Sequence, residues 1–134
     1  MFDYPTFGKI TKAINFAGSH FDTIILYFEH KTITLYAYGD CCSHSVFNIP
    51  NEDFAPLIGK TMTSITEDST YIDMTYDGDC KRVTPITIQL DNKTFFKFEL
   101  HNFSNGYYRG WMEVKEDEPT ELHSIPHDRT RCIY

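Results

Sequence analysis

Residues 39–45, with the sequence GDCCSHS, gather several groups that could do chemistry within one short stretch. Thiolate and imidazole are ligands that zinc prefers, and distant side chains that could complete such a site are Cys80, Cys132, His123 and His127. The spacing argues against it, because successive side chains of an extended chain point to opposite faces and the sequence has no Cys-x-x-Cys pair. We therefore predict no metal site, with one of the adjacent cysteines in the core and the other in a loop.

The same stretch also holds the residue types of a catalytic thiol, namely Asp40, Cys42 and His44. A nucleophile, its base and the group that orients the base usually converge from separate segments, and no motif of known mechanism is present. His20 and His101 could approach only if two halves of the chain pack together. We predict no catalytic residue, no cofactor and no enzymatic activity, and we keep a metal-binding or thiol-dependent protein as a third alternative.

A second candidate site is the stretch YYRGW at residues 107–111. Arginine among aromatic side chains is typical of protein-binding hot spots and of sites that stack a nucleotide base. Strand alternation would put Tyr107, Arg109 and Trp111 on one face, and the alternative is a strand with one buried aromatic face. The predicted residues for binding a ligand or partner are Tyr107, Tyr108, Arg109, Trp111, Cys42 and His44.

The overall charge limits the classes of partner. The chain has 134 residues, a formal net charge of −7 and 41% hydrophobic residues. The acidic excess argues against direct binding of nucleic acid, which needs clustered lysine and arginine. The longest apolar run, residues 24–28, has the length of a strand, so we expect no membrane-spanning segment and no secretory signal. The cysteines are then expected to be reduced thiols in a cytosol.

An internal repeat organises the elements that must position these residues. The segment PTFGKITKAI at residues 5–14 matches PLIGKTMTSI at residues 56–65, and FEHKTI at residues 28–33 matches LDNKTF at residues 90–95. The spacings differ, which places an insertion in the second copy, in the polar stretch 67–83. Each copy predicts a short turn ending in Gly-Lys, then a strand, a two-stranded hairpin and a loop.

The two glycines of this repeat, Gly8 and Gly59, are predicted to have positive φ angles at the end of a helical turn. The turn before Gly59 has its own start signals, with Asn51 as the expected cap and acidic residues directly after it.

Period-two patterns predict the hairpin of the second copy. Ile86 and Ile88 face one way in its first strand, and Phe96 and Phe98 face one way in its second strand. A three-residue loop at residues 91–93 sets Ile88 beside Phe96 and Ile86 beside Phe98, so that the two apolar faces coincide. The second or third residue of that loop is then left-handed.

In the first copy, the sequence favours a two-residue loop at residues 30–31. This loop pairs Phe28 with Ile33 and Leu26 with Leu35. The assignment is open to a second solution, because the tyrosines of the following strand could also face inward.

The last strand is expected at residues 107–115, after a turn at residues 102–106 that contains the strong turn signal Asn-Gly. The fold class predicted from these elements is α+β, mostly antiparallel β, with one or two short helical turns. We expect a single domain over residues 1–134, made of two pseudo-repeated β-hairpin units at residues 5–50 and 56–115 and a polar tail at residues 116–134.

The two candidate sites occupy equivalent positions in the two copies. The loop after the first hairpin contains GDCCSHS, and the loop after the second contains HNFSNGYY at residues 101–108. If the copies pack symmetrically, these loops lie at equivalent ends of the domain. We therefore expect them to share one surface, which is the functional or structural junction.

The segments LYAYGDCCSHSVF, LIGKTMTSI and SNGYYRGWMEV together resemble a domain family found mostly in bacteriophage genomes, for which no activity is established. The family marks are the motifs Asp-Cys-Cys-Ser, Leu-Ile-Gly and Ser-Asn-Gly-Tyr-Tyr, and the resemblance extends from about Gly8 to Val114. The chain departs from the pattern at Phe47, at Arg109 and in its acidic tail. The resemblance implies a phage origin and action in the cytoplasm of the host, and it implies no mechanism.

Two functions of different classes follow. The first is a small non-enzymatic inhibitor that binds a host anti-phage defence protein, such as a nuclease with a basic channel, and mimics phosphates with Glu113, Glu116, Asp117, Glu118 and Glu121. The alternative is a sponge that sequesters a nucleotide-type immune signal without cleaving it, held by Arg109, Lys60, Tyr107 and Trp111. Such binders are often oligomers with pockets between subunits, which makes a homo-oligomer an expected form.

Overall fold

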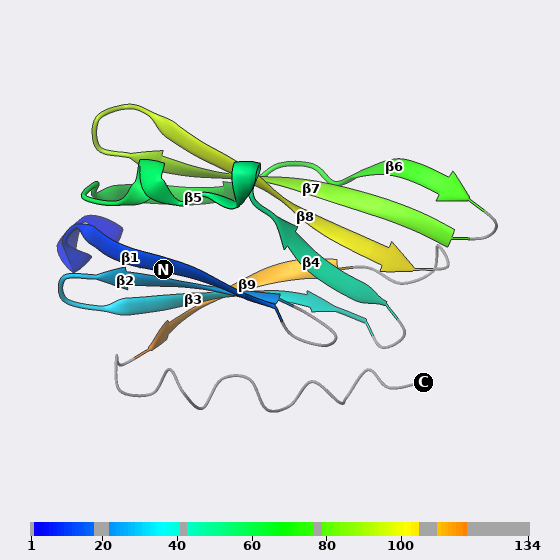
Figure 1. Cartoon of the computed structure of the whole chain (residues 1–134), viewed down its shortest axis with the longest axis horizontal. Helices are drawn as coiled ribbons and strands as arrows, with labels where there is room; N and C mark the ends of the chain where they lie inside the picture. Colours follow the sequence, from blue (N-terminus) through cyan, green and yellow to red (C-terminus); the bar gives the residue numbers. More distant parts are fainter. Residues whose placement is uncertain (1, 18–21, 41–42, 77–78, 105–109, 118–134) are drawn as a thin grey trace.

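Two antiparallel β-sheets packed face to face form the part of the chain that the computed structural model describes, namely residues 2–17, 22–40, 43–76, 79–104 and 110–117 (Figure 1). Sheet 1 has the strand order β1-β2-β3-β9, and sheet 2 has the order β4-β8-β7-β5, with β6 also pairing with β7. The strands are β1 (Ile10–Ala17), β2 (Asp22–Phe28), β3 (Thr32–Gly39), β4 (His44–Asn48), β5 (Met62–Glu67), β6 (Tyr71–Tyr76), β7 (Asp79–Leu90), β8 (Phe95–Ser104) and β9 (Gly110–Asp117).

Each sheet contains one strand that continues from a hairpin of the other sheet. Strand β4 follows β3 of sheet 1 but pairs with β8 of sheet 2, in a register that sets Phe47 opposite Leu100. Strand β9 follows β8 of sheet 2 but pairs with β3 of sheet 1, in a register that sets Leu35 opposite Val114. This strand exchange brings the ends of β3, β4, β8 and β9 together at one end of the molecule (Figure 1).

Alternation along the strands decides which side chains form the core between the sheets. In β3, Ile33 and Leu35 are fully buried, whereas Tyr36 and Tyr38 point the other way and stack on each other with ring centroids 5.5 Å apart. In β8, Phe98 is 3% exposed and packs against the rings of neighbouring phenylalanines in the core. The tyrosines of the first hairpin therefore do not face inward.

The mostly antiparallel β prediction is confirmed. The short helical turns that it included are present, but they number three in the described residues rather than one or two. The helical elements of the described residues are three 3₁₀ turns, η1 (Tyr4–Phe7), η2 (Pro50–Glu52) and η3 (Ala55–Leu57), and these residues contain no α-helix. Each turn has a proline at its first or second position, where the missing N–H has no partner within the turn and the fixed φ angle of proline suits a helical start. The described part of the chain is therefore all-β.

The predicted glycine conformations are confirmed, since Gly8 has a φ of 87° and Gly59 a φ of 81°. The predicted cap of the second turn is wrong. Asn51 lies inside η2 with a φ of 55°, and the carboxylate of Asp53 instead accepts the backbone N–H of Ala55 at 2.9 Å. Two short turns thus replace the single turn that the sequence suggested.

The second hairpin has the predicted register. Ile86 lies opposite Phe98 and Ile88 opposite Phe96, and Lys93 in the three-residue loop has a left-handed φ of 66°. Matching two apolar faces was enough to find this register, because a shift by one residue would turn one strand's apolar side chains to solvent.

The first hairpin has a two-residue turn, but it lies one residue earlier than predicted. Leu26 lies opposite Ile33, and the backbone N–H of Phe28 donates to the carbonyl of Lys31 at 2.8 Å. Glu29 leaves the ladder with β3 because it binds the chain before β1. Its N–H donates to the carbonyl of Lys9 at 3.0 Å, and its carboxylate accepts the N–H of Lys9 at 2.8 Å.

The turn predicted at residues 102–106 is wrong in its first half, because β8 continues to Ser104. The side chains of Asn102 and Ser104 are buried, which keeps the strand in register past the point where the polar composition suggested a turn. The last strand spans Gly110–Asp117, and the rest of the predicted turn and strand start, residues 105–109, lies outside the described residues.

A buried carboxylate at the start of β2 also links the two sheets. Asp22 of β2 is 6% exposed and accepts the backbone N–H of Phe47 in β4 at 3.0 Å. We expect Asp22→Ala to lower the free energy of unfolding by about 1–3 kcal/mol, because a buried N–H loses its acceptor. Asp22→Asn keeps an acceptor and should cost less. Urea unfolding of both variants tests this, and equal losses would contradict the assigned role.

Candidate functional site

A polar junction holds the two sheets together where β3 and β8 end and the exchanged strands β4 and β9 begin. It consists of Gly39 and Gly110, which pair across β3 and β9 in sheet 1, and of Ser43, Ser45 and Asn102, which face them from the side of sheet 2. A Cβ atom on Gly110 would lie 2.5 Å from the Ser45 hydroxyl oxygen and 2.7 Å from the Asn102 amide nitrogen. Only glycine lets the two sheets approach this closely.

The hydrogen bonds of the junction form a directed network. The hydroxyl of Ser43 donates to the carbonyl of Asp40 at 2.7 Å, and the hydroxyl of Ser45 donates to the carbonyl of Tyr38 at 2.9 Å. Asn102 Nδ2 donates to both hydroxyl oxygens, at 3.2 Å and 2.9 Å. Because each serine has already used its one proton, its oxygen acts as an acceptor toward Asn102.

This network leaves one buried acceptor without a partner. Asn102 is 3% exposed, and its Oδ1 has no hydrogen-bond partner, the one such buried side-chain atom among the described residues. A flipped amide would set Oδ1 beside the two serine oxygens and lose both bonds. The amide orientation therefore follows from the network, and the unused acceptor points away from β4.

A cavity of about 460 Å³ opens beside the junction. Its described lining residues come from the start of β6 and the link before it, and from β7, β8 and β9; they are Thr70, Tyr71, Ile72, Arg82, Thr84, Asn102, Gly110 and Trp111. Arg82 is the one charged side chain among them, and it lies opposite Asn102 in the β7–β8 ladder. Arg82 and Asn102 thus line the cavity from neighbouring strands.

Two aromatic residues, Trp111 and Tyr71, are among the described residues that line the cavity. Trp111 is 38% exposed, its indole N–H donates to Glu113 at 3.0 Å, and its ring lies 6.1 Å from that of Tyr38. These two contacts hold the indole in place. Tyr71 and Ile72 of β6 are more exposed, at 48% and 57%. Exposed rings that are already positioned bind planar groups with little loss of side-chain entropy.

The predicted binding residues fall in different places. Trp111 lines the cavity, but His44 lies on β4 with its ring 6.5 Å from that of Phe103, on the face of sheet 2 that turns away from the core. The structure therefore does not bring His44 to Trp111. Tyr107, Tyr108, Arg109 and Cys42 lie outside the described residues.

The shared surface predicted for the two loops falls partly on residues that the structure does not describe. Their flanking residues are side by side: Gly39 pairs with Gly110, and His44 pairs with Phe103. The described ends of both connections therefore meet at the polar junction.

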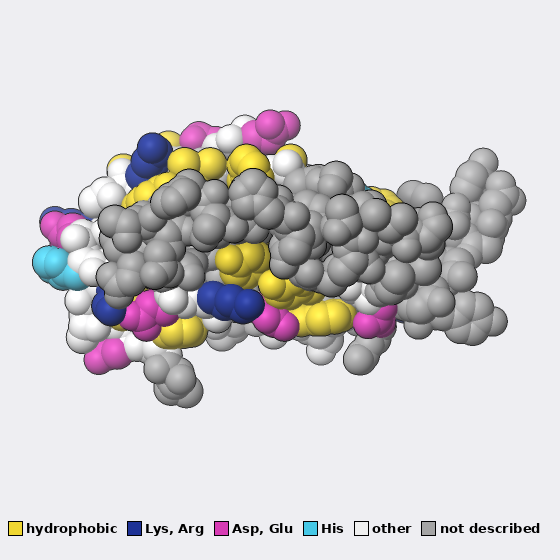
Figure 2. Space-filling view, turned by 90° about the horizontal axis from the view of Figure 1, so that it is seen from below, with side chains coloured by type: hydrophobic (Ala, Val, Ile, Leu, Met, Phe, Trp, Pro, Cys, Tyr) yellow, Lys and Arg dark blue, Asp and Glu magenta, His cyan; other side chains and the backbone are white. Residues whose placement is uncertain are grey.

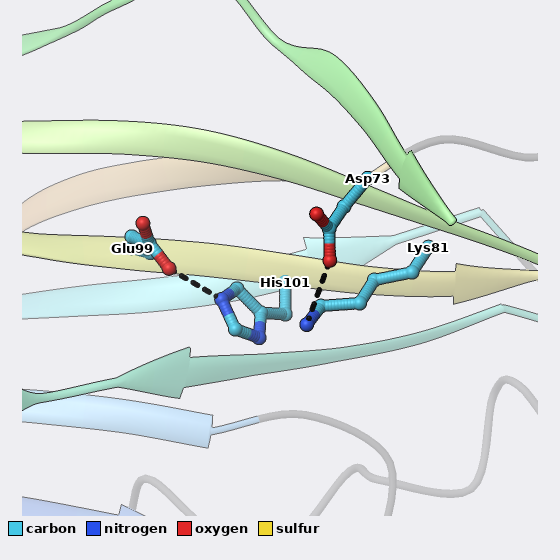
Figure 3. Close-up of polar contacts among 4 residues, drawn as sticks. All are labelled: Asp73, Lys81, Glu99 and His101. Atoms are coloured by element: carbon cyan, nitrogen blue, oxygen red, sulfur yellow. Dashed lines mark hydrogen bonds and ion pairs between the residues drawn. The ribbon is translucent and has the colours of Figure 1, made fainter.

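The outer face of sheet 2 carries histidine beside charged groups (Figure 3). His101 Nε2 lies 2.7 Å from a carboxylate oxygen of Glu99, two residues earlier on β8, and Lys81 of β7 forms an ion pair with Asp73 of β6 at 3.3 Å. These residues do not line the cavity, and Cys42, which the arrangement considered for a catalytic thiol needs, lies outside the described residues.

No group of three or more His, Cys, Asp or Glu side chains converges among the residues that the structure describes. Of the four cysteines, Cys80 is described, and it is a buried free thiol. Lys60, expected to help hold a nucleotide, does not line the cavity, and its ammonium group donates to the carbonyl of Pro56 at 3.3 Å.

The outer face of sheet 1 mixes charge and aromatic surface. Seen from that side, hydrophobic, basic and acidic side chains alternate over its coloured part (Figure 2). Lys115 lies over the rings of Tyr36 and Tyr38, at 5.2 Å and 5.8 Å from their centroids, and Glu116 forms an ion pair with Lys31 at 2.7 Å. In the described ranges, no helix is long and apolar enough to span a membrane.

The sequence alone missed Arg82, Tyr71 and Asn102. Asn102 could have been found by extending the alternation of Phe96, Phe98 and Leu100 by one step, which places its amide on the inward face. Arg82 and Tyr71 belong to the stretch interpreted as an insertion, and their meeting with Trp111 depends on the strand exchange.

Comparisons with known proteins give limited information. No family model matches the chain, and no solved structure matches it significantly. The chain is 36% identical over 81 residues, or 58% of its length, to Uncharacterized protein L278 of Acanthamoeba polyphaga mimivirus. The match covers 64% of that relative, so the chain spans less than two thirds of its length.

Proposed function

We propose that this protein binds a small nucleotide-type ligand in the cavity beside the polar junction and holds it without cleaving it. The observation that carries the proposal is the lining of the cavity, which combines Arg82, the exposed aromatic residues Trp111 and Tyr71, and the buried Asn102. A guanidinium group is suited to a phosphate, and aromatic faces are suited to a base.

The size and charge of the cavity support a small anionic ligand over a nucleic acid strand. Its volume of about 460 Å³ lies in the range of pockets for small molecules and cofactors. The chain as a whole carries a net charge of −7, so its overall field repels a phosphate group. Attraction of a phosphate therefore has to come from a local cation, which in the cavity is Arg82. A single nucleotide can use one cation, whereas a strand needs a basic track.

The resemblance to a mimivirus protein supports a viral origin. We infer that the protein acts in the cytoplasm of an infected host and lowers the free concentration of a nucleotide signal that the host uses in defence. The proposed membership of a phage-associated domain family agrees with such a role.

A second candidate function, an inhibitor that binds a host defence protein, is favoured by the apolar surface around the cavity. Tyr71, Ile72 and Trp111 are all exposed there, and exposed aromatic clusters are typical of protein-binding hot spots. Phosphate mimicry by the acidic side chains has less support, because Glu113 accepts the Trp111 indole N–H and Glu116 is paired with Lys31. A protein partner would therefore use apolar contacts first.

We also propose that the two hairpin units are pseudo-repeats. Gly8 and Gly59, each with a positive φ, precede β1 and β5, and both strands begin with a register shift, at Ile10–Lys12 and Met62–Ser64. The two units are also alike in their strand exchange, since the last strand of each unit pairs within the sheet of the other unit. Strand β6 has no counterpart in the first unit, which fits the insertion in the second copy.

Substitutions at the cavity test the proposed function. Trp111→Ala should weaken nucleotide binding by at least about fivefold, because stacking contributes roughly 1–3 kcal/mol per base. Arg82→Gln should weaken binding of phosphorylated ligands and leave binding of the free nucleosides almost unchanged. Calorimetry with nucleoside monophosphates, cyclic nucleotides and ADP-ribose gives the affinities.

Phe95→Ala is the matched control, because Phe95 is an exposed aromatic residue of β8 that does not line the cavity. This variant should bind like the unmodified protein. An absence of heat over the whole panel would overturn the nucleotide proposal. Retention of a host protein that is lost with Trp111→Ala would instead support the inhibitor.

A further inference from the structure

We propose that two copies of this chain pair through their β1 strands, so that sheet 1 of one copy continues into sheet 1 of the other. Strand β1 is an edge strand that pairs with β2 on one side. On its other side the described chain contacts only its start, where the N–H of Ile10 donates to the carbonyl of Lys60 and its carbonyl accepts the N–H of Gly59, both at 2.8 Å. Beyond Ile10, no described strand pairs with this side of β1.

The direction of the backbone groups along β2 decides which groups of β1 are free. In the first hairpin, the N–H of Phe28 donates to the carbonyl of Lys31 at 2.8 Å, so Phe28 directs its backbone groups to β3. Successive residues of an antiparallel strand direct these groups to opposite sides, so Tyr27 and Ile25 direct theirs to β1. A side-chain contact agrees with this assignment, since Thr11 Oγ1 donates to the carbonyl of Tyr27 at 3.2 Å.

Two residues of β1 therefore direct their N–H and C=O groups to the open edge. Ile25 lies opposite Ile14, so Ile14 uses its backbone groups on β2. Its neighbours Ala13 and Asn15 direct theirs away from β2. Both line a second cavity, of about 350 Å³, which lies at this edge and gives room for an added strand.

A second copy of β1 satisfies these groups when the antiparallel pair is centred on Ile14. Ala13 then lies opposite Asn15 of the second copy, and the two residues exchange hydrogen bonds, twice by symmetry. A centre at Ala13 would bring in Ile10, whose outward groups are already bonded. A centre at Asn15 would set Lys12 opposite a position beyond the end of the strand. The register centred on Ile14 is therefore the one that uses residues 12–16 in full.

The side chains of this register complement one another on the outer face of sheet 1. Ile14 lies beside Ile14 of the second copy, and Lys12 lies beside Phe16, whose side chain is 42% exposed. The ammonium group of Lys12 lies over the ring of Tyr27, so its aliphatic stem is left to cover Phe16 of the second copy. Strand β1 has no acidic residue, although the chain carries a net charge of −7, so like charges do not meet at this edge.

The inner face of the added strand closes the second cavity. Asn15 of the second copy lies opposite the small side chain of Ala13, next to the other residues that line this cavity, which include Ile49, Glu52 and Phe54. Its amide can there donate to the Glu52 carboxylate. Each copy thus supplies a residue to the cavity of the other. The pairing uses none of the described residues that line the cavity beside the polar junction.

The other described edges have features that oppose pairing. Strand β9, at the far edge of sheet 1, has four charged residues among eight. Strand β4 is five residues long, and register shifts leave only short regular stretches in β5 and β6. Charged, short and interrupted edges are those that proteins protect from association. Strand β1 is regular over residues 12–17 and has a single charge, so it is the least protected edge of the described chain.

Sedimentation velocity over a range of protein concentrations measures the association. We expect the unmodified protein to form a dimer that dissociates on dilution. Added salt should strengthen this dimer, because it screens the repulsion between two chains of net charge −7. In hydrogen exchange, the amides of Ala13 and Asn15 should exchange more slowly as the fraction of dimer rises.

Two matched substitutions test whether β1 is the interface. Phe16→Ala should weaken the dimer by about fivefold or more, because its ring loses contact with the second copy. Phe103→Ala is the control, since Phe103 is equally exposed, at 41%, but lies on β8 of sheet 2, and it should leave the dissociation constant unchanged. Ile14→Lys should weaken the dimer by at least about tenfold, because it sets two like charges side by side.

A backbone substitution separates pairing from folding. Asn15→Pro removes an N–H that faces the open edge and keeps the ladder with β2, a position at which edge strands accept proline. Urea unfolding should show a folded protein, while sedimentation shows a monomer. Ile14→Cys tests the register, because facing residues of such a pair have Cα atoms about 4.5 Å apart, a separation that a disulfide spans. Under mild oxidation this variant should give a crosslinked dimer that the unmodified protein does not.

Three results would overturn the inference. The first is a monomer at every concentration. The second is a dimer that is unaffected by Ile14→Lys and Asn15→Pro, or that Ile14→Cys does not crosslink. The third is a monomer whose β1 amides are protected only after incubation with host lysate, which would assign the edge to a segment of another protein.

Discussion

Gly110→Ala is expected to lower the free energy of unfolding by about 3 kcal/mol, because the added methyl group meets the polar junction with no room to move. Its Cβ would lie 2.5 Å from the Ser45 oxygen and 2.7 Å from the Asn102 nitrogen, and both atoms are fixed by hydrogen bonds on a neighbouring sheet. To remove these close contacts, β9 would have to shift away from sheet 2. This shift would separate Trp111 from the other residues that line the cavity. Urea unfolding followed by circular dichroism measures the change.

Gly59→Ala is the control for this prediction. Gly59 has a positive φ of 81°, but a Cβ atom there meets nothing within 4 Å. Its replacement should therefore cost only the backbone strain of a left-handed alanine, about 1 kcal/mol. If Gly110→Ala costs no more than Gly59→Ala, the sheets do not approach as closely at the junction as described.

Phe98→Ala is expected to destabilise the protein by about 3–5 kcal/mol. Phe98 is 3% exposed and lies at the centre of β8, where its ring packs edge-on against Phe47 of β4 at 5.6 Å and against Phe96 at 6.0 Å. The cavity left by the ring would lie between three strands that are bonded to one another, so the core could not collapse to fill it. The loss is measured as a lower midpoint of urea unfolding at an unchanged slope.

Lys97→Ala controls for effects of substitution in the same strand. Lys97 is exposed and points to the opposite face, so its loss should change the free energy of unfolding by less than about 0.5 kcal/mol. A cost for Phe98→Ala as small as that for Lys97→Ala would contradict the placement of Phe98 in the core.

The sequence was informative where one strand pair carries a clear apolar face. The register of Ile86 and Ile88 against the phenylalanines of β8 could be derived from parity alone. The left-handed residue of the loop could be narrowed to Asn92 or Lys93, and in the structure it is Lys93. The first hairpin could not, because the position of its turn depends on bonds from Glu29 to Lys9, which come from a different segment. Local patterns report pairings between neighbours in sequence and carry no information on such distant contacts.

The candidate site was only partly predictable for the same reason. Trp111 was found from its composition, but its neighbours in the cavity come from β6, β7 and β8. Asn102 lies in a polar stretch that the sequence suggests is a turn, but in the structure it is buried and pairs with Ser45 of β4 and Arg82 of β7. In the GDCCSHS stretch the cysteines suggested possible chemistry. The residues of this stretch that the structure places in the junction are Gly39, Ser43 and Ser45.

The exchange of strands also has a consequence for how the protein folds. Sheet 1 cannot be completed until β9, from the far end of the described chain, reaches β3, and sheet 2 cannot be completed until β4 leaves the first hairpin for β8. Neither half can therefore persist as a stable intermediate with all its strands in place. Such a topology has a high contact order, so slow and cooperative folding in a single transition follows from the way in which the two sheets share their strands.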